Sequence, residues 1–111
     1  MKIIVIPFNS IPILINEPKK NLNHIWLHDQ VNGYLESVTL PNSILLINEE
    51  GKLQNLPYNK VASELFRIIN TNDVIVGNAV LVGPVDNEGN FTQIPQDIID
   101  HVMDIWNAIN N

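Results

Sequence analysis

The chain has 111 residues, of which 45% are hydrophobic and 16% are charged, and this balance predicts one folded domain, residues 1–111, and excludes a disordered acidic tail. The formal net charge of −6 argues against a surface that grips a nucleic-acid backbone, since such binding depends on Lys and Arg. Because there is no cysteine, disulfides and cysteine-ligated metals are excluded, and a reducing cytoplasm is the expected setting.

The N-terminus predicts a hairpin. Residues 2–8 are rich in Ile and Val and predict a strand. The alternation of residues 11–16 predicts its antiparallel partner, and Pro12 indicates that this second strand lies at the edge of the sheet. The apolar run before Pro7 is too short for a signal peptide, and no run approaches the roughly 20 residues needed to cross a bilayer.

A helix and two strands are expected next. Apolar residues recur at helical spacing from Asn21 through His28 or slightly beyond, with Asn21 as the N-cap and Gly33 as the left-handed residue after the last turn. Residues 34–40 alternate and predict a partly exposed strand. Residues 44–47 are uniformly apolar, which indicates a central strand covered on both faces.

The following loop leads into a second helix. Residues 49–52 have turn chemistry, with Gly51 free to adopt a positive φ. Asn59 is expected to cap a helix over residues 60–69, whose apolar side chains share one face.

Two short strands and a third helix complete the chain. Residues 74–76 and 79–82 are apolar and flank Gly77 and Asn78, which predicts a tight turn, and Gly83 indicates a close backbone approach. The last helix runs from Pro95, in its first turn, to Ile109. The element order predicts an α+β fold: a mostly antiparallel sheet of about six strands with three helices packed on it, covering one face.

The chain shows no catalytic or metal signature. His24 and His28 lie four residues apart, which suits one metal on a helix face, but a third and fourth ligand are missing, so two packed or exposed histidines are the better interpretation. Asp97 and His101 repeat this spacing without a nucleophile nearby. No serine has the context of an activated nucleophile. We therefore expect a protein without enzymatic activity, cofactor or metal.

The polar stretch from Asn48 to Asn59 is the strongest candidate for a binding site. Its amides, phenol and single cation suit the recognition of a nucleotide's base and ribose edges. The alternative is local: Asn55 makes a turn, Asn59 caps a helix and Tyr58 packs. The predicted ligand-binding residues are Asn48, Lys52, Gln54, Asn55, Tyr58, Asn59, Gly77 and Asn78.

Four blocks of the chain resemble the family called domain of unknown function 3846: residues 32–36 (NGYLE), 44–53 (ILLINEEGKL), 56–59 (LPYN) and 73–83 (DVIVGNAVLVG). Members of that family occur in phages, plasmids and their bacterial hosts. The resemblance therefore implies a small accessory protein of a phage or mobile element, and it implies no reaction.

Small acidic proteins of such genomes often counter host defence, and two routes fit this chain. One is sequestration of a nucleotide immune signal, usually by a homo-oligomer. The other is docking on a host protein, including by imitation of DNA. A structural or regulatory partner of a phage protein is a third possibility. The acidic residues are scattered apart from the last helix, which favours the first route. The expected partners are thus a small nucleotide-like ligand or a host protein, and neither nucleic acid nor a membrane.

Overall fold

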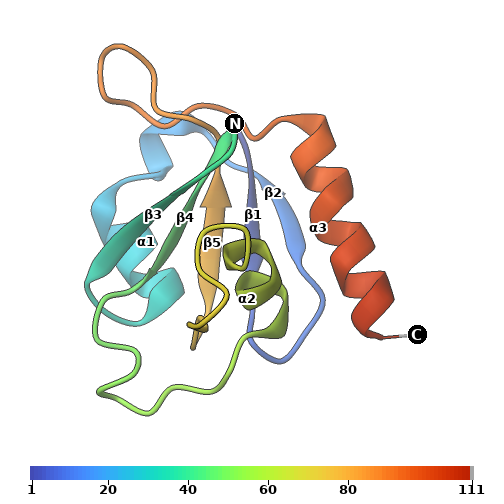
Figure 1. The fold of residues 1–111 in the computed structure, drawn as a ribbon. Coiled ribbons are helices and arrows are strands. Elements are labelled where there is room, and N and C mark those ends of the chain that lie inside the picture. Colours follow the sequence, from blue (N-terminus) through green and yellow to red (C-terminus); the bar gives the residue numbers. More distant parts are fainter. Residues whose placement is uncertain (111) are drawn as a thin grey trace.

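A computed structural model describes residues 1–110, without the side chain of Asn21. Among these residues, five antiparallel strands form one sheet in the order β2-β1-β5-β4-β3 (Figure 1). The predicted α+β class is confirmed, with five strands in place of about six. The strands are β1 (Lys2–Ile6), β2 (Ile13–Asn16), β3 (Leu35–Leu40), β4 (Ser43–Asn48) and β5 (Ala79–Val82).

The missing sixth strand is residues 74–76, where the prediction was wrong. Val76 forms only an isolated bridge with Tyr58. The hydroxyl of Ser63 instead holds Ile75, since its Oγ accepts from the Ile75 N–H at 2.9 Å and donates to the Ile75 carbonyl at 3.2 Å. The apolar residues of this segment therefore pack without a ladder of strand hydrogen bonds, because strand propensity supplies no pairing partner.

Helices cover both faces of the sheet, which corrects the expectation that one face carries all three. Helix α1 (His24–Val31) packs on one face, where Val31 and Leu27 meet Ile44, Val80 and other strand residues. Helices α2 (Lys60–Phe66) and α3 (Gln96–Ile109) pack on the other face, over Leu45 and Leu81 among others. The central strands β4 and β5 are apolar on both sides, and both sides must therefore be covered.

The ends of α1 differ from the prediction. Asn23 is the N-cap, and its Oδ1 accepts from the Trp26 N–H at 3.0 Å, while the side chain of Asn21 lies outside the described residues. Asn32 takes the left-handed conformation with φ 60°, in place of Gly33. Gly33 has a different role, because a Cβ there would lie 2.7 Å from the Asn48 Nδ2.

Glycines and caps elsewhere give a mixed outcome. Gly51 does not have a positive φ, whereas Asn55 does, with φ 54°. The close approach at Gly83 is confirmed, since a Cβ there would overlap the carbonyl oxygens of Thr92 and Gln93. Pro95 is the N-cap of α3 and precedes its first turn. No helix among the described residues is both long and apolar enough to span a membrane.

Candidate functional site

The predicted polar stretch connects β4 to α2, and its first residue has a structural role. Asn48 is only 4% exposed. Its Nδ2 donates to the carbonyl oxygens of Val31 and Asn32, at 3.1 and 3.3 Å, and to the Gln54 Oε1 at 3.2 Å, while its Oδ1 accepts from the Glu50 N–H at 2.8 Å. Asn48 thus ties the end of α1 to the loop, and its amide is fully used by the protein.

Asn59 caps α2, as predicted, and also joins three segments. It is 1% exposed. Its Oδ1 accepts from the Ala62 N–H at 3.0 Å, and its Nδ2 donates to the carbonyl oxygens of Ile6 and Gly77, at 2.9 and 2.8 Å. Both N–H groups of the amide and its oxygen are therefore used in hydrogen bonds within the protein.

Other residues of the predicted site also have local roles. Asn55 lies in a turn, in the left-handed conformation that Asn tolerates. The Gly77 N–H donates to the Pro57 carbonyl, and Gly77 has φ 77°. The Asn78 Oδ1 accepts from the Phe8 N–H at 3.1 Å. The structure therefore does not gather the eight predicted residues into one site: Asn48 and Lys52 line one hollow, and Tyr58 and Asn59 line another.

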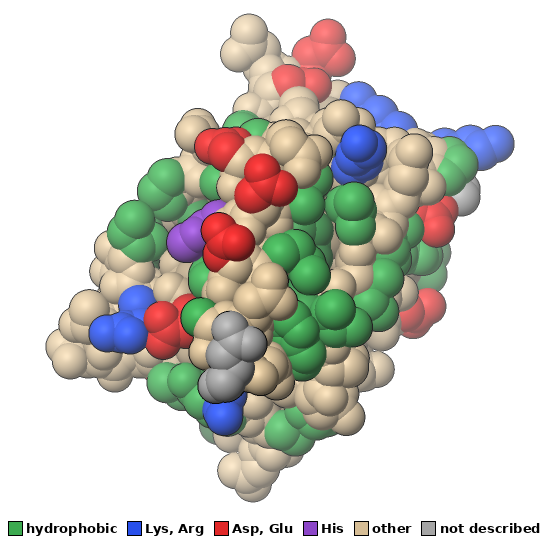
Figure 2. Space-filling view, turned by 90° about the vertical axis from the view of Figure 1, so that its right-hand side faces the viewer, with side chains coloured by type: hydrophobic (Ala, Val, Ile, Leu, Met, Phe, Trp, Pro, Cys, Tyr) green, Lys and Arg blue, Asp and Glu red, His purple; other side chains and the backbone are tan. Residues whose placement is uncertain are grey.

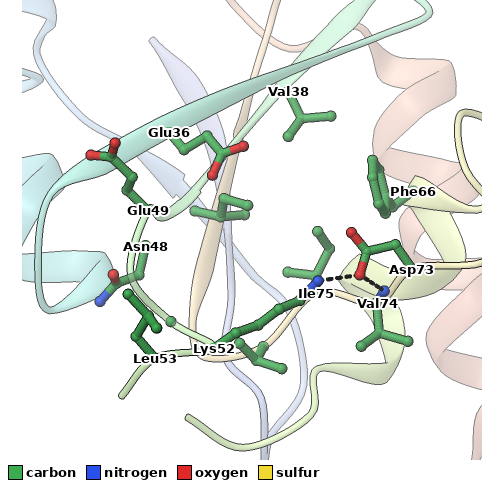
Figure 3. Close-up of a pocket in the computed structure, with 13 residues that line it drawn as sticks. Glu36, Val38, Asn48, Glu49, Lys52, Leu53, Phe66, Asp73, Val74 and Ile75 are labelled. Carbon is green, nitrogen blue, oxygen red and sulfur yellow. Dashed lines mark hydrogen bonds and ion pairs between the residues drawn. The ribbon is translucent and has the colours of Figure 1, made fainter. Parts of the chain in front are cut away.

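The first hollow, here called the carboxylate hollow, lies between β3, the loop after β4, α2 and the segment 73–76 (Figure 3). Its volume is ≈ 150 Å³. The side chains of Val38, Ile47 and Phe66 form the apolar part of its lining. In Figure 3 the Glu36 carboxylate points into the hollow and Asp73 lies on the opposite side, whereas Glu49 points away. The lining of the carboxylate hollow thus has more carboxylates than cations.

Lys52 is the one cation among the residues lining the carboxylate hollow, and it forms an ion pair with Asp73. The Lys52 ammonium and the backbone N–H of Val74 hold the pKa of Asp73 below its ordinary value. The side chains of Lys52 and Asp73 are 56% and 41% exposed, so solvent screens the pair and it contributes little to stability. It does, however, leave Glu36 without a cation, since no described residue pairs with it.

The second hollow, here called the aromatic hollow, lies where the β1–β2 turn meets the start of α2 and the end of α3, and its volume is ≈ 280 Å³. Three aromatic side chains line it: Phe8, Tyr58 and Trp106. Tyr58 is 48% exposed and Phe8 36%. Polar groups come from Lys60 and from the amides of Asn9 and Asn110, and no described lining residue carries a carboxylate.

The sequence model of one protein family, described as a domain of unknown function (DUF3846), matches residues 1–107. The chain belongs to that family. The match includes β1, β2 and most of α3, beyond the four blocks on which the resemblance was based. No curated protein and no solved structure matches this DUF3846 protein.

Among residues 1–110 of this DUF3846 protein, no three or more His, Cys, Asp or Glu side chains are gathered into a group that could hold a metal ion. The rings of His24 and His28 lie edge to face, with 6.0 Å between their centroids, and the rings of His28 and Tyr34 do the same at 5.7 Å. At Asp97 and His101, no hydrogen bond joins the pair; the neighbouring Asp100 accepts from Gln96 at 3.0 Å.

Sequence reasoning missed the residues that complete both hollows. Lys60 lies 52 residues after Phe8, and Trp106 lies 46 residues after Lys60, so no local pattern joins these three residues. Glu36 and Asp73 lie in two separate family blocks, and only the fold brings them to opposite sides of the same hollow. One signal was available: Glu36 is the only charged residue of the alternating strand over residues 34–40.

Proposed function

We propose that this DUF3846 protein binds and sequesters a nucleotide-type ligand in the aromatic hollow, without a catalytic step. In this proposal it serves a phage or other mobile element, in the cytoplasm of a bacterial host, by removing a nucleotide signal of host defence. The supporting observation is the lining of the hollow: three aromatic side chains and Lys60, with no carboxylate among the described residues.

The residue types suit the parts of a nucleotide. An exposed aromatic ring stacks on a base with about 1–3 kcal/mol of stabilisation, and every base offers a π face. Asn9 supplies an amide donor and acceptor for base or ribose edges, and Asn110, whose Nδ2 donates to the Trp106 carbonyl at 2.8 Å, adds the acceptor Oδ1. Lys60 supplies a positive charge for a phosphate. A hollow of ≈ 280 Å³ is near the lower end of ligand sites, and it therefore fits a base and ribose with the phosphates at its mouth.

Charge argues against the carboxylate hollow as the nucleotide site. Glu36, Glu49 and Asp73 would repel a phosphate, and Lys52 is already paired with Asp73. Its volume of ≈ 150 Å³ is also too small for a base with its ribose. The proposal therefore keeps Tyr58 from the predicted site and adds Phe8, Lys60 and Trp106.

The experiment is ligand release. Purified protein is incubated with a panel of cyclic and ADP-ribose-type nucleotides, separated from free ligand, denatured and analysed for what it releases. Wild type is expected to retain a nucleotide, and Tyr58→Ala and Lys60→Met are each expected to lower its affinity about tenfold or more.

Matched controls are Tyr34→Ala and Lys52→Met, which remove an exposed tyrosine and a lysine away from the aromatic hollow. They should retain the nucleotide as wild type does. If wild type releases nothing, or if the controls weaken binding as much as the hollow variants, the proposal is wrong.

A second candidate function is docking on a host protein by imitating the charge of DNA. Figure 2 shows acidic side chains in a row on the side of the molecule formed by α3. The exposed acids of this helix are Asp97, Asp100 and Asp104. In cells that carry a nucleotide-signalling defence, this function predicts that Asp100→Asn with Asp104→Asn abolishes protection of an infecting phage, whereas Tyr58→Ala does not; the sequestration proposal predicts the reverse.

A further inference from the structure

Strand β3 is an outer strand whose free edge has a defined set of backbone groups. The Glu49 N–H donates to the Tyr34 carbonyl at 2.8 Å, which makes these two residues a hydrogen-bonded pair. Pairs alternate along an antiparallel ladder, so the N–H and C=O groups of Leu35, Ser37 and Thr39 point away from β4. No described strand pairs with this edge. It therefore offers a row of donors and acceptors for an added strand.

The side chains of β3 alternate as well, and the face they share with the carboxylate hollow is charged. Glu36 and Val38 line that hollow, and Ser37 and Thr39 are exposed on the opposite face. A strand added at this edge would place every second side chain beside Glu36 and Val38. The edge and the hollow thus form one continuous surface.

Charge selects what can add to this surface. Glu36 points into the hollow and has no cationic partner among the described residues, and the protein as a whole carries −6. A second copy would bring another Glu36 and another −6, and like charges on neighbouring strands are unfavourable. A nucleic acid would be repelled for the same reason. A basic strand would be attracted both by the Glu36 carboxylate and by the net negative charge of the whole protein.

The hollow fits one side chain of such a strand. At ≈ 150 Å³ it accepts a single long side chain. The alkyl part of Lys or Arg would cover Val38, Ile47 and Phe66, and its charged head would meet Glu36. Because Asp73 is already paired with Lys52, Glu36 is the carboxylate available to the incoming cation.

We propose that the free edge of β3 and the carboxylate hollow dock an extended, basic segment of a partner protein, which adds to the sheet as a sixth strand and inserts one Lys or Arg side chain beside Glu36. This surface is separate from the aromatic hollow, and neither proposal depends on the other. The mode is strand addition, in which backbone hydrogen bonds give affinity and alternate side chains give specificity.

The test is a titration of ¹⁵N-labelled protein, followed by NMR, with a seven-residue peptide of alternating arginine and valine. The amide signals of Ser37 and Thr39 are expected to shift with saturation, and Glu36→Lys should weaken binding about tenfold or more. Glu88→Lys makes the same charge change on an exposed loop and should bind as wild type does.

Two further peptides separate strand addition from simple attraction. Replacing the central valine with proline removes a backbone donor and should weaken binding about tenfold. A peptide of alternating glutamate and valine should not bind. The proposal is overturned if the β3 amides do not shift, if Glu88→Lys weakens binding as much as Glu36→Lys, if the proline peptide binds as well, or if the β3 amides shift on concentration of the protein alone, which would assign the edge to a second copy.

Discussion

The side-chain amide of Asn59 donates a hydrogen bond of 2.9 Å to the carbonyl oxygen of Ile6, across 53 residues of sequence. The same nitrogen donates to Gly77, and the amide oxygen caps α2. One buried side chain therefore fixes the end of β1, the start of α2 and the approach to β5 relative to one another.

Removing this amide should be strongly destabilising. Asn59→Ala would lose an N-cap, which costs about 1 kcal/mol, and would leave two buried carbonyl groups short of a donor, at about 1 kcal/mol or more each. We expect the free energy of unfolding to fall by about 3 kcal/mol, measured by chemical denaturation. Asn59→Asp keeps the cap acceptor but faces those carbonyl oxygens with a carboxylate, so it should be no more stable than Asn59→Ala. Asn107→Ala, on the exposed side of α3, is the control and should be close to neutral. A loss below about 1 kcal/mol in Asn59→Ala would contradict this role.

The hydroxyl of Ser63 should hold the segment 73–76 against α2. In Ser63→Ala the N–H of Ile75 loses its acceptor in a buried position, which is expected to cost about 1–3 kcal/mol. Hydrogen exchange of the Ile75 amide should speed up more than that of β5. Ser37→Ala, at an exposed position of β3, should alter neither quantity. Unchanged exchange at Ile75 would show that packing alone holds this segment.

Asn55 should matter through its backbone and not through its amide. Its φ of 54° suits glycine and is strained for alanine. We expect Asn55→Gly to leave the midpoint of thermal unfolding nearly unchanged and Asn55→Ala to cost about 1 kcal/mol. Neither variant should change nucleotide retention, since Asn55 lines neither hollow. Weaker nucleotide retention in Asn55→Gly, with stability unchanged, would show that the Asn55 side chain takes part in binding.

The ionisation of Asp73 should depend on Lys52. The pKa of Asp73 is lowered in the folded protein, first by the hydrogen bond from Lys52. A carboxyl group whose folded pKa is depressed stabilises the fold above its unfolded pKa, and this contribution is lost as the pH falls through the folded pKa. Lys52→Met should raise the pKa of Asp73 toward its ordinary value, as measured by NMR titration of the carboxyl carbon. It should also reduce the acid-induced loss of stability. Lys60→Met should leave this titration unchanged, and an unchanged pKa in Lys52→Met would assign the shift to the Val74 N–H alone.

Much of the fold could be predicted from local patterns. Strands β1 and β4 are continuous apolar runs, which is typical of strands covered on both faces, and the apolar residues of α3 repeat with the helical period. The strand predicted at residues 74–76 failed because Val74, Ile75 and Val76 have the right side chains and no partner strand. The candidate site was less predictable. Asparagine is abundant here, and its side chain can bind either a ligand or a backbone carbonyl. Which of the two Asn59 binds depends on Ile6, which lies 53 residues away in the sequence and is therefore outside any local pattern.

Strand β5 lies between β1 and β4 and hydrogen-bonds to both, whereas the hairpin of β1 and β2 and the hairpin of β3 and β4 do not pair with each other. During synthesis, both hairpins leave the ribosome before the strand that unites them. The nascent chain therefore keeps the inner edges of β1 and β4 open until residue 82 has emerged. Folding of this domain therefore depends on a late, long-range closure, and the apolar faces of both hairpins stay exposed until then.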